Sequence, residues 1–136
     1  MSYTLLINKN NKHHEVHSPS PEEIEGVIDS LIPVPYHYLI LFSNDKLNHY
    51  IQTVATSDGS EKEIEYLVEI RFEYGKRPGE NFDQYQYTTY NINILKRMFR
   101  MYALDVNPDI SDWTDITEKI KNLPDIETQR AQLEEK

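Results

Sequence analysis

The stretch EKEIEYLVEIRFEY, residues 61–74, decides the fold class. Successive side chains of a β-strand point to opposite faces of a sheet, so alternate residues share a face. One face of this segment is apolar and holds Ile64, Tyr66, Val68, Ile70, Phe72 and Tyr74. The other face holds Glu61, Glu63, Glu65, Leu67, Glu69, Arg71 and Glu73. The pattern predicts a long strand that buries one face and exposes an almost continuous row of carboxylates.

Segments on both sides of this stretch predict further strands. They lie at residues 3–8, 37–43, 47–56 and 82–90, with 13–17 as a short return strand or loop. The run at 37–43 is apolar at most positions, which predicts burial on both faces of that strand. Turn residues at 44–45, 57–60 and 75–81 separate the later strands. Because these connections are short, we expect an antiparallel meander.

A helix start signal precedes the strand at 37–43. Ser20 is placed as the N-cap, Pro21 as the first helical residue and Glu23 as the residue that completes a capping box. The apolar residues of the following turns share one side of the helix, namely Ile24, Val27, Ile28 and Leu31. Pro33 and Pro35 end the helix.

A second helix is predicted to begin near Asn91. Its apolar stripe consists of Ile94, Leu95, Met98, Phe99 and Tyr102, and Lys96, Arg97 and Arg100 lie on the opposite side. Trp113 is expected to pack against this helix or the sheet. Together these elements predict an α+β fold, a curved antiparallel β-sheet of about four to six strands with two main helices packed on one face. We expect one domain over residues 1–120 and a charged tail over 121–136.

The overall charge restricts the class of partner. The chain has 136 residues, 23 acidic and 14 basic, for a formal net charge of −9. This charge repels nucleic acid and anionic lipid, and it favours a basic partner.

The chain has no cysteine, so it has no disulfide or thiol nucleophile. The N-terminus does not have the pattern of a signal peptide, and no apolar run is long enough for a membrane span. We expect a cytoplasmic protein.

Two sets of titratable residues are candidates for catalysis or metal binding. Carboxylates two residues apart on a strand are about 7 Å apart, within the range of inverting glycosidases, but a solvated sheet face explains the same pattern. His13, His14 and His17 suggest a metal site, yet only two of the three share a strand face and no acid pair completes a motif. His37 and His49 are expected to be cross-strand neighbours in a hairpin. Without a nucleophile or phosphate-binding motif, we expect no catalytic residue, no metal and no cofactor.

The chain has ten tyrosines and only four phenylalanines, which is unusual. Tyrosine is enriched in protein interfaces because it offers a large contact area and a polar tip. We assign Tyr66 and Tyr74 to the core, and Tyr85 and Tyr87 to a binding surface. Aromatic strands also bind single-stranded nucleic acid, but such sites lie in basic grooves.

The candidate partner-binding site combines glutamates of residues 61–74 with tyrosines of the next strand. Carboxylates complement a basic protein surface and speed the encounter with it. The site is placed at Glu63, Glu65, Glu69 and Glu73, with Tyr85 and Tyr87 as anchors if strand 82–90 lies beside strand 61–74. From residue chemistry alone, a plain solvent face explains the glutamates equally well.

The order of the features resembles a known family. A capped acidic helix (PSPEEIEGVIDSL) is followed by a hairpin (YHYLILFSNDKLNHYIQTVAT), the acidic-faced strand (EIEYLVEIRFEY) and a tyrosine-bearing strand. A helix (INILKRMFRMYAL) and a short W-x-D-I element (WTDI) complete the series. Over residues 18–118 this order resembles the first immunity-protein family of bacterial polymorphic toxin systems, which includes immunity proteins of contact-dependent growth inhibition.

The resemblance implies a small cytoplasmic protein that is not an enzyme. Such a protein binds and neutralises a cognate toxin domain from a neighbouring cell, often a nuclease or a nucleic-acid deaminase. It does so by masking the active site or the substrate-binding surface. Two alternatives stay open at this point: a small enzyme that uses the carboxylates or histidines, and a protein-interaction module that has no toxin partner. The sequence leaves the oligomeric state open.

Overall fold

The computed structural model of the chain describes residues 2–9, 12–30, 37–46, 48–56, 63–74 and 81–121. Its sheet contains β1 (Tyr3–Lys9), β2 (Lys12–His17), β3 (Tyr38–Ser43), β4 (Tyr50–Ala55), β5 (Tyr66–Glu73), β6 (Phe82–Thr89) and β7 (Thr114–Asp115). The helices are α1 (Pro21–Ser30), α2 (Ile92–Ala103) and α3 (Thr117–Lys121). The strand order is β2-β1-β3-β4-β5-β6-β7, and every pair is antiparallel.

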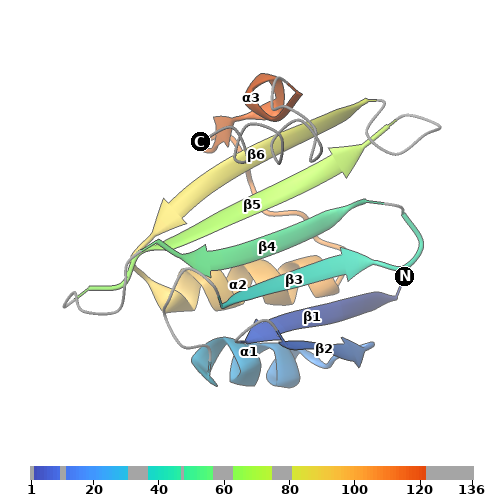
Figure 1. The fold of residues 1–136 in the computed structure, drawn as a ribbon, viewed down its shortest axis with the longest axis vertical. Helices are drawn as coiled ribbons and strands as arrows, with labels where there is room; N and C mark the ends of the chain where they lie inside the picture. Colours follow the sequence, from blue (N-terminus) through green and yellow to red (C-terminus); the bar gives the residue numbers. More distant parts are fainter. Residues whose placement is uncertain are drawn as a thin grey trace, which may run out of the picture.

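The expected α+β class is confirmed. The sheet is curved and open, and α2 lies behind its central strands in Figure 1. The seven strands exceed the expected four to six because two short strands extend the edges. One is β2, which includes residues 13–17, predicted as a short return strand or loop, and the other is the two-residue β7.

The core lies between the sheet and the two longer helices. Cross-strand partners of an antiparallel sheet point to the same face, so the register identifies one face through Leu5, Leu41, Ile51 and Ile70. All four side chains are fully buried, and they form one cluster with residues of α1 and α2. We call this the covered face and the opposite one the open face.

The capping box at the start of α1 is confirmed. The Glu23 backbone N–H donates to Ser20 Oγ at 3.1 Å, and the Ser20 N–H donates to Glu23 Oε1 at 3.1 Å. These bonds satisfy donors that a helix start otherwise leaves unpaired. Ile24 and Ile28 are buried, as expected. The predictions for Leu31, Pro33, Pro35 and the turn at 57–60 lie outside the described residues.

Helix α2 also begins where predicted. The Asn91 side chain caps it by accepting from the Asn93 N–H at 2.9 Å. Leu95, Phe99 and Tyr102 are buried in the core. Ile94 was assigned to the same stripe, but its side chain is 37% exposed because it lies at the edge of the buried arc.

Two expectations about single residues are wrong. Tyr66 is a core residue, but Tyr74 is 65% exposed because β5 ends at Glu73. The Tyr74 hydroxyl donates to Asp83 Oδ2 at 2.7 Å, and this bond raises the pKa of Tyr74 to about 12. His37 and His49 are not cross-strand neighbours. The register pairs Tyr38 with Val54 and Phe42 with Tyr50, which puts the histidines at opposite ends of the hairpin.

Candidate functional site on the open face of the sheet

The open face carries a row of half-buried apolar side chains. Its half-buried apolar residues lie on adjacent strands and form a continuous band: Leu6, Tyr38, Ile40, Phe42, Tyr50, Val54 and Leu67. We call this set the apolar band. A solvated face of an antiparallel sheet is usually polar, and contiguous apolar surface commonly marks a site of interaction. The band is therefore the candidate binding surface.

The apolar run at 37–43 predicts burial on both faces of β3, and this prediction is wrong for the open face. Leu39 and Leu41 are fully buried against the helices, whereas Ile40 and Phe42 are half-buried on the open face. Their neighbours on the open face include the paired residues of β1 and β4.

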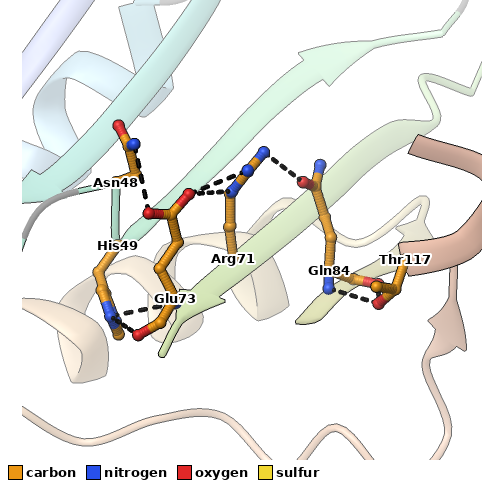
Figure 2. A network of polar contacts seen from close by, with 6 residues as sticks. All are labelled: Asn48, His49, Arg71, Glu73, Gln84 and Thr117. Carbon is orange, nitrogen blue, oxygen red and sulfur yellow. Dashed lines mark hydrogen bonds and ion pairs between the residues drawn. The ribbon is translucent and has the colours of Figure 1, made fainter. Parts of the chain in front are cut away.

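A polar network lies beside the apolar band, and Figure 2 shows its residues. Arg71 pairs with Glu73 through its Nη2 at 2.9 Å and its Nε at 3.1 Å, and its Nη1 donates to Gln84 Oε1 at 3.3 Å. Asn48 Nδ2 donates to the other carboxylate oxygen of Glu73 at 3.3 Å. The Glu73 side chain is only 6% exposed. Glu73 is therefore engaged within the chain and is a poor candidate for pairing with a cation of a partner.

The network also fixes the start of α3. The Gln84 backbone N–H donates to Thr117 Oγ1 at 2.9 Å, so the helix is attached to β6 (Figure 2). The Arg71 guanidinium lies 3.8 Å from the centre of the Phe82 ring, in a cation–π contact. Both contacts hold the network in one arrangement at the edge of the apolar band.

His49 joins the network from the opposite side. Its Nε2 lies 2.8 Å from the Glu73 carbonyl oxygen and 3.1 Å from the Glu73 backbone nitrogen, and the ring tautomer decides which contact is the hydrogen bond. Tyr50 lies next to Arg71 across the β4–β5 pair. Burial raises the pKa of the Tyr50 hydroxyl, and Arg71 opposes this shift. Tyr50 is therefore neutral at physiological pH.

Glu69 has a different environment from Glu73. Its Oε2 accepts from Gln52 Nε2 at 2.9 Å and from Gln84 Nε2 at 2.9 Å. Among the described residues, no cation lies within ion-pair distance of this carboxylate, and its Oε1 has no hydrogen-bond partner. Two amides thus orient a carboxylate that has one oxygen available to a ligand.

A hollow of about 320 Å³ opens beside Glu69. Its described lining comprises Tyr38, Ile40, Gln52, Thr53, Val54, Leu67 and Glu69. A second hollow, of about 560 Å³, adjoins it at Ile40 and extends past Phe42 and Tyr50. The open face is therefore recessed along the apolar band.

The remaining predicted glutamates precede β5, which begins at Tyr66. Glu63 is exposed, and Glu65 is half-buried with its Oε1 accepting from Thr56 Oγ1 at 2.9 Å. The four glutamates thus differ in their contacts. Glu63 and Glu65 lie at one end of the strand, Glu69 lines the hollow and Glu73 is paired internally.

The two predicted tyrosine anchors lie on the other face. Strand β6 does pair with β5, but Tyr85 is opposite Ile70 and Tyr87 is opposite Val68, so both tyrosines point to the covered face. Tyr87 stacks on Trp113, with ring centres 5.6 Å apart, which confirms that Trp113 packs against the sheet. The six predicted contact residues therefore do not form one surface. The open face instead carries Tyr38, Phe42 and Tyr50 in the apolar band, and Phe82 under the Arg71 guanidinium.

The histidines of β2 are divided between the two faces of the sheet. His14 lies opposite Ile7, whereas His13 and His17 lie opposite Asn8 and Thr4, which point the other way. Within the described ranges, no group of three histidine, aspartate or glutamate residues is arranged to hold a metal ion. In the same ranges, no helix has the length and apolar composition needed to cross a membrane.

The fold and this surface define the class: an α+β protein with two helices on one face of an antiparallel sheet and a recessed apolar band on the other. Comparisons of the chain with protein-family models, with curated proteins and with solved structures find no match.

Proposed function

We propose that this chain is a cytoplasmic immunity protein that binds and neutralises a cognate toxin domain. The toxin domain is basic and acts on nucleic acid, as a nuclease or a deaminase does. Binding masks the active site of the toxin or the surface that receives its substrate. The observation that carries the proposal is the half-buried apolar band on the open face, because such a surface is suited to a protein partner.

The net charge and the order of the elements indicate which kind of partner the chain binds. The net charge of −9 favours a strongly basic protein, and enzymes that bind nucleic acid carry basic surfaces. The order of elements that resembles the immunity family is the order of α1, β3, β4, β5, β6 and α2 in the fold. The open face replaces the mixed set of glutamates and tyrosines as the proposed contact surface.

The test is co-expression with the C-terminal domain of the protein that the gene immediately upstream encodes. We expect a stable complex on co-purification and rescue of growth from that domain. Ile40→Asp places a charge in the apolar band and should abolish rescue. Ile94→Asp is the matched control, because Ile94 is an exposed isoleucine on α2, which covers the other face.

The outcomes test the immunity function and the choice of binding surface separately. Rescue by the wild type and by Ile94→Asp, with loss in Ile40→Asp, supports both the function and the surface. Rescue by both variants supports immunity but excludes the open face. If the domain is toxic and the wild-type chain neither binds it nor restores growth, the proposal fails for that pair.

A further inference from the structure

We propose that the hollow beside Glu69 receives one arginine side chain of the partner. The inference rests on the proposed function, since it specifies what the toxin presents to the open face. The aliphatic part of the arginine packs on Tyr38, Val54 and Leu67, and the guanidinium group pairs with Glu69.

The first argument is the difference between two carboxylates on the same strand. Glu73 and Glu69 both lie on the open face, but Arg71 neutralises only Glu73. The Arg71 guanidinium is held by Glu73 and Gln84, and it forms no ion pair with Glu69. Glu69 is held by two amide groups, which orient it without supplying a positive charge. A cation from outside the described chain complements this carboxylate.

The second argument is the shape and lining of the hollow. A volume of about 320 Å³ is at the lower end of the range of roughly 300–1,000 Å³ found for ligand pockets. Such a space suits one long side chain better than an extended peptide. Tyr38, Ile40, Val54 and Leu67 supply apolar walls, and the carboxylate is the single charged group among the described lining residues. A side chain with an apolar stem and a cationic end matches this arrangement.

The third argument distinguishes arginine from lysine. The guanidinium group is more weakly hydrated than an ammonium group, so its partial burial costs less. It is also planar and stacks on aromatic rings, and Tyr38 lines the hollow. Its several N–H donors reach the Glu69 oxygen and neighbouring acceptors together, such as the side-chain oxygen of Gln52.

The first experiment compares two Glu→Gln variants of the full chain for affinity to the upstream-encoded toxin domain. Glu69→Gln keeps an oxygen for the amide donors but removes the charge, and we expect binding to weaken by about tenfold or more, mainly through faster dissociation. Glu65→Gln removes the same charge just before β5 and should change affinity by less than about twofold. Val54→Phe fills the hollow without a change of charge and should also weaken binding.

The inference is overturned if Glu69→Gln and Val54→Phe both bind like the wild type. It is also overturned if Glu65→Gln loses as much affinity as Glu69→Gln, because net charge alone then accounts for the loss. Either result leaves the proposed function intact, since the wild-type complex still forms.

The second experiment does not need the toxin. We would follow backbone amide NMR signals of the wild-type chain during titration with N-acetyl-arginine amide and, separately, N-acetyl-lysine amide, at tens of millimolar. Signals of Ile40, Val54 and Leu67 should move with the arginine probe and stay fixed in Glu69→Gln. An absence of shifts at these residues overturns the inference even if the chain proves to be an immunity protein. Equal or larger shifts with the lysine probe overturn the choice of arginine.

Discussion

The covered face and the open face of the sheet are made from alternate residues of the same strands, but their side chains are buried in different ways. On β3, Leu39 and Leu41 are fully buried in the core cluster that includes the helices, whereas Ile40 and Phe42 are half-buried beside residues of β1 and β4. Burial under helices stabilises the fold. Apolar surface without such a cover contributes less to folding and remains available for binding.

Substitutions on neighbouring residues of β3 test this difference most directly. Leu41→Ala removes a fully buried side chain and leaves a cavity, so we expect the free energy of unfolding to fall by about 2–5 kcal/mol. Urea unfolding followed by circular dichroism measures this loss. The folded fraction should still bind the partner with wild-type affinity. A loss below about 1 kcal/mol would contradict the assignment of this face as the core.

The Arg71–Glu73 pair is the part of the open face that we expect to matter for folding. Arg71→Met removes the guanidinium that pairs with the nearly buried Glu73 carboxylate. We expect a loss of about 2–3 kcal/mol, which is below the cost for a fully buried pair because Arg71 is 16% exposed. The measurement is again urea unfolding at neutral pH.

A double variant is the control for this loss. Arg71→Met combined with Glu73→Leu removes both charges, and it should recover much of the stability lost in the single variant. If the double variant is less stable than Arg71→Met alone, lost packing rather than the loss of the ion pair explains the effect.

Ile40→Ala should separate stability from binding. Ile40 is half-buried, so the loss of unfolding free energy should be about 1 kcal/mol, well below that of Leu41→Ala. The loss of partner affinity should follow the opposite order, since Ile40 lines both hollows. Unfolding and binding measured on the same two variants provide the comparison. Equal effects on binding would show that the two faces do not divide these roles.

The fold class could be predicted from the sequence because the features that define it depend on residues close together in the chain. The Ser20–Glu23 capping box gives the start of α1, and the alternation in residues 64–72 gives the two faces of β5. The buried stripe of α2 follows from its spacing. Each of these features depends on residues a few positions apart, so no knowledge of pairing is required.

The site could not be predicted to the same extent because it depends on pairing between strands. The face of Tyr85 is set by its position opposite Ile70, and the separation of His37 from His49 is set by the β3–β4 register. A shift of one residue moves every side chain to the other face. Likewise, Gln52 and Gln84 contact Glu69 from two different strands, so no local sequence motif indicates these contacts.

The smallest expected effect concerns a polar pair on the covered side. The Tyr3 hydroxyl donates to Asp105 Oδ1 at 2.5 Å, which lowers the pKa of Asp105 from its usual 3.8. Burial, followed by this hydrogen bond, raises the pKa of Tyr3 above 10. The Asp105 contribution to stability is therefore present above its unfolded pKa and is lost as the pH falls. The Tyr3 contribution is present below about pH 10 and is lost as the pH rises.

Tyr3→Phe should flatten both limbs of the stability–pH profile. The carboxyl pKa of Asp105, followed by ¹³C NMR, should rise toward 3.8 because its largest stabilising contact is gone. Partner affinity should stay at the wild-type level, since Tyr3 packs on Tyr102 of α2 and belongs to the covered face. Unchanged acid and alkaline limbs would show that the pair does not hold in solution. A loss of affinity in Tyr3→Phe would instead place part of the binding surface on the helical side of the sheet, which the two-face comparison excludes.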